Sequence, residues 1–137
     1  MAVIEELIRK EENGTISFGN YLLDSKSKVS DFEYEGDLYK VKTYKEITKL
    51  ERNGLFVYES VPGTAVFDLS LTEKSVCFTV EGVQDSQITL ELEPEKEFKI
   101  FIDETNIGKM KTNLGGKLVL SVELSEKEKA DIKVVKL

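Results

Sequence analysis

Residues 117–124 read Lys-Leu-Val-Leu-Ser-Val-Glu-Leu, in which apolar side chains recur at every second position. Successive side chains of an extended strand point to opposite faces. The apolar face carries Leu118, Leu120, Val122 and Leu124. The opposite face carries Lys117 and Glu123 together with one valine, Val119. Because one apolar and one polar face per strand is typical of two packed antiparallel sheets, the segment predicts a strand of a β-sandwich.

The same alternation runs along most of the chain, in short segments separated by turn residues. Asn13-Gly14 and Glu35-Gly36-Asp37 predict hairpins, and Pro62-Gly63 ends a segment. The expected strands cover residues 3–11, 15–22, 29–34, 38–44, 55–61, 65–71, 75–80, 87–92, 98–103, 107–111, 117–124 and 132–136. This spacing predicts an all-β fold, an antiparallel β-sandwich with an N-terminal β-hairpin region and at most a short helix.

Four of these segments are expected to present one apolar row each to the core. The rows are Ala65, Phe67, Leu69 and Leu71; Val76, Phe78 and Val80; Ile88, Leu90 and Leu92; and Phe98, Ile100 and Ile102.

The secondary structure of residues 43–54 is ambiguous. Thr43 and Glu46 fit a helix capping box and Gly54 fits a helix end, which slightly favours a helical turn. A strand turned by Asn53-Gly54 is the alternative.

Pro62-Gly63 divides the chain by composition. All five tyrosines precede it, whereas the remainder is aliphatic and regular. We therefore expect an aromatic-rich β-hairpin region at 1–61 and an immunoglobulin-like β-sandwich at 62–137, which could also form one continuous domain. About 60 residues alone would make a marginal core.

Several function classes are disfavoured by residues that the chain lacks. It has 137 residues, no histidine, and one cysteine, Cys77, which we expect to be a buried strand residue. Without histidine or a cysteine pair, no nucleophilic triad, metal site or cofactor is expected, and the chain is predicted not to be an enzyme. The net charge of −7 disfavours nucleic acid and anionic membranes as partners. The acidic start and the unpaired cysteine predict a cytoplasmic protein.

Two resemblances add to this reading. Residues 98–109 and 116–122 resemble a hairpin, glycine turn and strand of the immunoglobulin-like modules of bacterial polysaccharide-degrading and surface proteins, which implies a non-catalytic module. Segments 36–43, 90–95 and 110–116 resemble small uncharacterised bacterial proteins often labelled "endosialidase". That label implies cleavage of polysialic acid. Sialidases hold the substrate carboxylate with three arginines, whereas this chain has only Arg9 and Arg52 and no tryptophan, so endosialidase or other glycosidase activity is not expected.

The two acidic clusters are expected to be exposed polar segments and not catalytic or metal sites. Asp31, Glu33 and Glu35 should share one solvated strand face, with Asp37 after the turn, and the stretch from Asp103 to Asn106 should be a polar hairpin tip rather than a calcium loop. The tyrosines are the only candidate ligand-binding residues: Tyr34, Tyr39, Tyr44 and Tyr58. They could form an aromatic platform for sugars, although packing within strands explains them as well.

The sequence thus predicts a non-enzymatic β-sandwich module that acts by protein contact or self-association. The alternative is a carbohydrate-binding module that uses the N-terminal tyrosines. The candidate partners are a second copy, another protein or a glycan. Self-association is favoured because residues 117–124 form an unusually apolar strand, with Val119 on the face opposite the other apolar residues, and because residues 134–137 resemble an apolar edge strand. The competing interpretation is that Val119 and Val135 cover each other within one chain.

Overall fold

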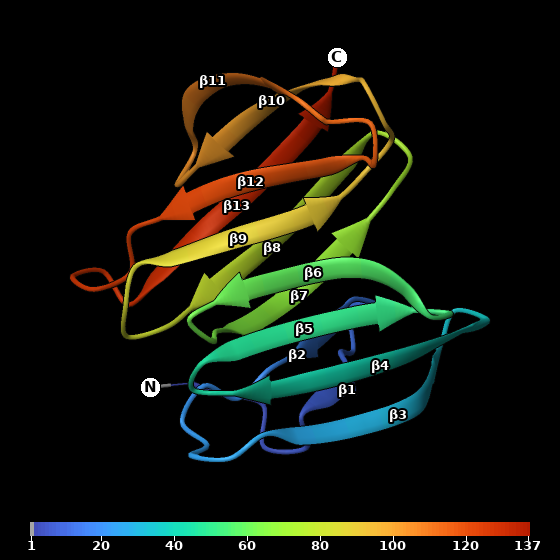
Figure 1. Ribbon diagram of the computed structural model, residues 1–137, viewed down its shortest axis with the longest axis vertical. Coiled ribbons are helices and arrows are strands. Elements are labelled where there is room, and N and C mark those ends of the chain that lie inside the picture. Colours follow the sequence, from blue (N-terminus) through green and yellow to red (C-terminus); the bar gives the residue numbers. More distant parts are fainter. Residues whose placement is uncertain (1) are drawn as a thin grey trace.

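The computed structural model describes residues 2–137 (Figure 1), so Met1, the first residue of the expected 1–61 region, lies outside the description. Residues 2–137 contain thirteen strands, all paired antiparallel, and no helix that could cross a membrane. The strands are β1 (Ile8–Lys10), β2 (Ile16–Phe18), β3 (Ser27–Tyr34), β4 (Asp37–Tyr44), β5 (Ile47–Arg52), β6 (Leu55–Val61), β7 (Ala65–Leu71), β8 (Ser75–Glu81), β9 (Ser86–Glu91), β10 (Glu97–Ile102), β11 (Thr105–Lys111), β12 (Lys117–Val122) and β13 (Lys129–Lys136).

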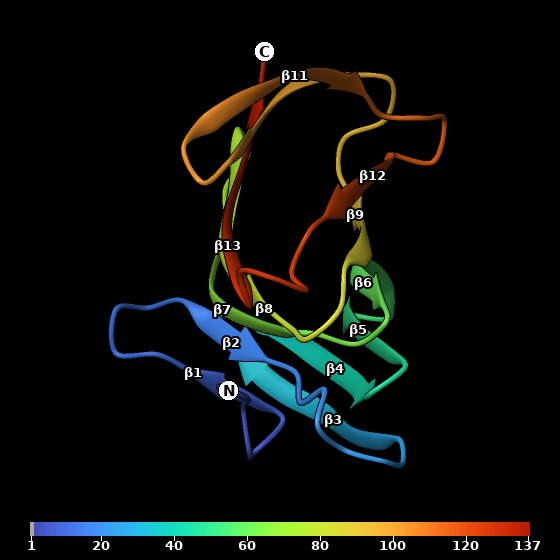
Figure 2. The same ribbon diagram turned by 90° about the vertical axis from the view of Figure 1, so that its left-hand side faces the viewer.

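The strands form two sheets that face each other (Figure 2). Sheet A has the order β1-β2-β7-β8-β13-β10-β11, and sheet B has the order β12-β9-β6-β5-β4-β3. Strands β3 to β6 follow one another as a meander, whereas the later part of the chain crosses repeatedly between the sheets. The predicted all-β antiparallel sandwich is confirmed.

One hydrophobic cluster fills the space between the sheets and includes residues from both sides of Pro62. Its fully buried members include Phe18, Leu50, Tyr58, Ile88 and Ile100. Both sheets also cross the composition boundary, because β6 pairs with β9 and β2 pairs with β7. The aromatic part and the aliphatic part therefore contribute to the same core.

The expected apolar row of β7 is wrong in one respect. A bulge between Phe67 and Ser70, with Asp68 at a φ of 56°, shifts the alternation within the strand. As a result Val66 faces the core, while Phe67 pairs with Thr79 on the outer face. The extra residue that a bulge inserts moves all later side chains relative to the earlier ones.

The first two strands are shorter than the expected segments 3–11 and 15–22. Strand β1 has only three residues because the chain turns at Leu7, which has a φ of 72°. The hairpin at Asn13-Gly14 is present, with Gly14 at a φ of 87°. Local alternation therefore indicates the hairpin correctly but overestimates its length.

The helical turn favoured for residues 43–54 is wrong, and the strand alternative is correct. Ile47 and Leu50, one turn apart in a helix, lie on opposite faces of β5, where Leu50 is fully buried. The Thr43 hydroxyl lies 2.8 Å from the Thr48 hydroxyl instead of capping a helix. Pairing with β4 on one side and β6 on the other satisfies the backbone of β5 and overrides its local helical signals.

The last strand is not an edge strand, contrary to the sequence interpretation. Strand β13 lies between β8 and β10 in sheet A, whereas β12 forms an edge of sheet B. Val135 pairs with Ser75 and Lys99, and Val119 pairs with Thr89. The two valines belong to the outer faces of different sheets and do not cover each other.

A buried polar network fixes the crossing from sheet B to sheet A. Thr64, just before β7, is fully buried, and its hydroxyl lies 2.8 Å from the Tyr58 hydroxyl and 2.7 Å from that of Ser60. The Thr48 hydroxyl donates to the Thr64 carbonyl at 2.7 Å. No side-chain nitrogen or oxygen buried within residues 2–137 lacks a hydrogen-bond partner. The network therefore joins β5 and β6 to the start of β7 without an unsatisfied group.

Replacing Thr64 with valine is expected to lower the free energy of unfolding by about 2 kcal/mol or more, because the buried hydroxyls of Tyr58 and Ser60 lose a shared partner. Urea denaturation measures this change. Thr105→Val is the matched control at an exposed position in β11 and should change the free energy by less than about 0.5 kcal/mol. Equal effects of the two variants would contradict a structural role for the network.

Candidate functional site

The structure buries Tyr58, the last of the four candidate tyrosines. Its ring is fully buried and packs edge-on against Phe18 and Phe78, with centroid distances of 5.3 and 5.7 Å. Burial raises the pKa of its hydroxyl far above the ordinary value. A ring with no exposed face cannot stack on a sugar, so the expected ligand-binding role of Tyr58 is corrected to a core role.

Tyr34 and Tyr39 are the only pair of candidate tyrosines in residues 2–137 whose rings pack together, with centroids 5.6 Å apart. Tyr39 is only 3% exposed, and burial raises its pKa, which the guanidinium of Arg52 partly opposes. The Tyr34 hydroxyl donates to the carbonyl oxygen of Gly14. Tyr34, Tyr39 and Arg52 line a small cavity of about 120 Å³, whose lining also includes Glu35 and Asp37.

Tyr44 lies apart from this pair, at the other end of β4. Its hydroxyl donates to Glu46 at 2.6 Å, and the ammonium of Lys26 lies 5.7 Å from its ring centroid. The four tyrosines therefore do not share one surface. Their spacing along the sequence could not reveal this, because β3, β4 and β6 present them at different depths.

The acidic clusters are exposed, as the alternation indicates for Asp31, Glu33 and Glu35. Asp103 and Glu104 form the turn between β10 and β11. The backbone N–H of Asp131 and the ammonium of Lys127 lower the pKa of Asp103. Within residues 2–137, no three His, Cys, Asp or Glu side chains are grouped so as to hold a metal ion.

The largest cavity identified in the described part of the chain was not predicted from the sequence. It has a volume of about 650 Å³ and lies at the end of the sandwich where β5, β7 and β9 end. These strand ends are on the right in Figure 1. We call it the inter-sheet mouth. Its lining combines side chains of both sheets: Arg52, Leu55, Phe56, Val57, Leu71, Thr72, Glu73, Ser75, Val76, Glu91, Leu92, Glu93 and Phe98.

The floor of the inter-sheet mouth is apolar and its rim is charged. Val57, Val76 and Phe98, at 8%, 4% and 4% exposure, belong to the hydrophobic core. Leu55, beside the Asn53-Gly54 turn, is 68% exposed at the rim. The only sequence signal for this site was an arginine and a leucine flanking a tight turn, which is too common a pattern to indicate a cavity.

Two of the three acids at the rim are neutralised within the chain. Glu91 forms an ion pair with Lys117, and Glu93 forms one with Lys136, which lowers the pKa of Glu93. Arg52 lines both the inter-sheet mouth and the small tyrosine cavity. Arg9 pairs with Glu6 and Glu11, whereas Arg52 forms no ion pair with a carboxylate of residues 2–137. Beside its apolar floor the mouth therefore presents one guanidinium that forms no ion pair within residues 2–137 and that also interacts with the Tyr39 hydroxyl in the tyrosine cavity.

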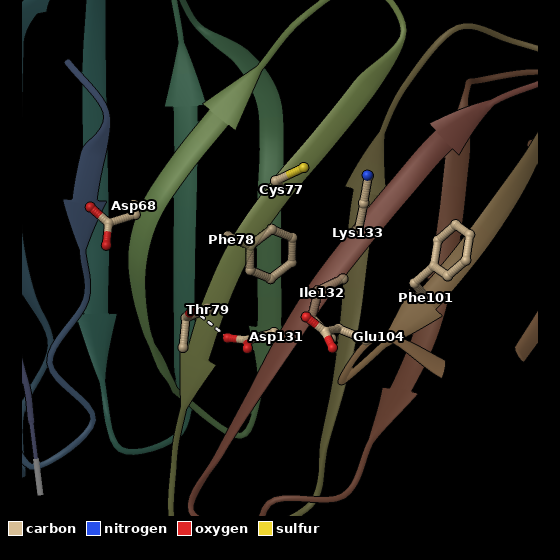
Figure 3. A pocket seen from close by; sticks show the side chains of 9 residues that line it. All are labelled: Asp68, Cys77, Phe78, Thr79, Phe101, Glu104, Asp131, Ile132 and Lys133. Atoms are coloured by element: carbon tan, nitrogen blue, oxygen red, sulfur yellow. Dashed lines mark hydrogen bonds between the residues drawn. The ribbon is translucent and has the colours of Figure 1, made fainter. Parts of the chain in front are cut away.

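A second hollow, of about 430 Å³, lies on the outer face of sheet A (Figure 3). Cys77, Lys133 and Phe101 form a cross-strand row on β8, β13 and β10. The Thr79 hydroxyl donates to Asp131 at 2.7 Å along the next row. Cys77 is half-buried on this outer face, not buried in the core as expected, because Val76 and Phe78 take the two inward positions beside it.

Comparison of the chain with protein-family models, curated proteins and solved structures found no match.

The position of Cys77 predicts that its thiol reacts with dithionitrobenzoate in the folded protein. One thionitrobenzoate anion per chain should be released without denaturant, more slowly than in urea, because the side chain is half-buried. Absorbance at neutral pH follows the reaction, and Cys77→Ser is the blank. Reaction only after unfolding would place Cys77 in the core instead.

Proposed function

We propose that this chain is a non-enzymatic β-sandwich module, located in the cytoplasm, that self-associates through the free edge of β12. The observation that carries this proposal is the contrast between β12 and the other three sheet edges. An exposed edge strand offers unpaired backbone groups to another chain, and proteins usually blunt such edges.

Three of the four edges carry features that discourage pairing. Strand β1 has only three residues. Strand β3 is interrupted by a bulge between Val29 and Phe32. Strand β11 has a register shift opposite Ile100 and carries Lys109 and Lys111. Short length, bulges and lysines are the usual means by which edges are protected.

Strand β12 has none of these features apart from a lysine at its first residue. Its six residues pair with β9 in unbroken register, and the inward side chains of Leu118, Leu120 and Val122 are each 2% exposed. Val119 on the outer face is 39% exposed. The edge is therefore regular, and it carries an exposed valine, which suits a strand-pairing surface.

The hydrogen bonds of β12 show which of its backbone groups are free. The N–H of Leu92 donates to the carbonyl oxygen of Gly116 at 2.7 Å, so the backbone groups of Gly116 face β9. Because the backbone groups of successive strand residues point in opposite directions, the N–H and C=O groups of Leu118, Leu120 and Val122 also face β9. The Lys117 N–H and C=O are both engaged by Asn113. The backbone groups of Val119 and Ser121 consequently point to the free edge.

These free groups select one register for an antiparallel pair of β12 strands. A two-fold axis at Leu120 places Val119 opposite Ser121 of the second copy, so that both residues use their N–H and C=O groups. The same register places Lys117 opposite Glu123 of the second copy, twice by symmetry. The edge is thus self-complementary in charge as well as in hydrogen bonding.

Val119→Pro is expected to give a folded monomer, whereas the wild-type chain forms a dimer at micromolar concentration. Proline removes one of the two N–H groups, those of Val119 and Ser121, that face the free edge, and it leaves the pairing with β9 intact. Sedimentation velocity measures the mass, and circular dichroism confirms the fold. Val119→Thr keeps the N–H and should remain dimeric. A monomeric wild-type chain would refute the proposal, as would a Val119→Pro dimer.

Charge exchange tests the register. Glu123→Lys should weaken the dimer about tenfold, because two lysine pairs then face each other across the two-fold axis. Adding Lys117→Glu to this variant should recover most of the affinity. Sedimentation equilibrium gives the dissociation constants. An unchanged constant for Glu123→Lys would exclude this register while leaving pairing through β12 to be judged by the proline variant.

A further inference from the structure

The inter-sheet mouth has the size and the lining of a small-molecule site. Ligand cavities commonly span roughly 300–1,000 Å³ and are mostly apolar with a few placed polar groups. The mouth measures about 650 Å³ and reaches core side chains of both sheets. An apolar body seated against Val57, Val76 and Phe98 would leave water without displacing any hydrogen bond of the fold.

The polar group available to a ligand at the rim is Arg52. The ammonium groups of Lys117 and Lys136 are already paired with Glu91 and Glu93. A guanidinium presents parallel N–H donors that match a carboxylate, and such charged pairs are stronger than neutral hydrogen bonds. The rim is therefore matched to a carboxylate rather than to an amine.

Sugars fit the mouth less well, because its aromatic faces are occupied. The Lys117 ammonium lies 4.1 Å from the Phe56 ring centroid, and that of Lys49 lies at 5.8 Å. Phe98 is buried in the floor. Aliphatic carbon, which needs no stacking face, is the better match to this lining.

Charge limits the ligand to one carboxylate. Glu73 at the rim forms no ion pair within residues 2–137, and the chain carries a net charge of −7. A second negative group on the ligand would face this repulsion without a second free cation in the lining. We propose that the inter-sheet mouth binds a monocarboxylate with an aliphatic body, of the size of a medium-chain fatty acid.

Calorimetric titration with decanoate, below its micelle concentration, tests this site. Decanoate should bind with one molecule per chain, whereas decanol and decylammonium should bind at least about tenfold more weakly, because neither can form the carboxylate pair. Amide chemical shifts should change at residues 52–57, 71–76 and 91–98. Equal binding of all three probes, or no binding of decanoate, would overturn the proposal.

Single-residue variants test the guanidinium and the apolar part of the site separately. Arg52→Gln should weaken decanoate binding about tenfold, and Arg52→Lys should weaken it less. Leu55→Asp changes a residue that is 68% exposed, so the fold should persist while the new charge repels the ligand. Arg9→Gln is the matched control and should leave binding unchanged. Binding that is insensitive to Arg52→Gln would refute the role of the guanidinium.

Discussion

The hydroxyl of Thr64 is the contact on which the two-layer arrangement depends. The chain leaves sheet B after β6 and enters sheet A at β7, and the last residues of this crossing, Gly63 and Thr64, are buried, where water cannot satisfy backbone groups. Thr64 meets the hydroxyls of Tyr58 and Ser60, and Thr48 satisfies its carbonyl and its N–H. Gly63 lies so close to the carbonyl oxygen of Tyr44 that a side chain would overlap it. The crossing therefore holds the two sheets in one relative position.

With the sheets in this position, two surfaces have groups that the fold itself does not use: the β12 edge of sheet B and the inter-sheet mouth. Sheet B ends in β12, whose pairing with β9 leaves the backbone of Val119 and Ser121 unused. At the end where β5, β7 and β9 stop, the apolar interior remains accessible beside Arg52. We propose that the first surface pairs with a second copy of the chain and that the second binds a small amphipathic ligand. The two proposals share Lys117, which pairs with Glu91 beside the inter-sheet mouth and lies opposite Glu123 in the proposed dimer. Their decisive variants change different residues, Val119 for the dimer and Arg52 for the mouth, so the two proposals can fail independently.

Ion pairs at the inter-sheet mouth connect its chemistry to the fold. Glu91 on β9 pairs with Lys117 on the neighbouring β12, and Glu93 pairs with Lys136 from sheet A. These partly exposed pairs contribute little stability, but they compensate the carboxylates of Glu91 and Glu93, which line the same cavity as Arg52. Arg52 forms no ion pair within residues 2–137, since Glu91 and Glu93 are paired with Lys117 and Lys136 instead.

The sequence by itself determined the strands and the class of fold, because the two-residue period of segments such as 117–124 is a local property of the chain. It also placed the hairpin turns at Asn13-Gly14 and at Glu35-Gly36-Asp37, since these turns need no distant partner. Only the tertiary structure decided that residues 47–52 form a strand, that Phe67 faces outward after a bulge, and that β12 rather than β13 is an edge. The sequence likewise did not determine that Tyr39 and Tyr58 are buried. Nor did it determine that Arg52 forms no ion pair within residues 2–137. Each of these depends on which strands become neighbours, and neighbours far apart in sequence are chosen by packing of the whole core rather than by any local pattern.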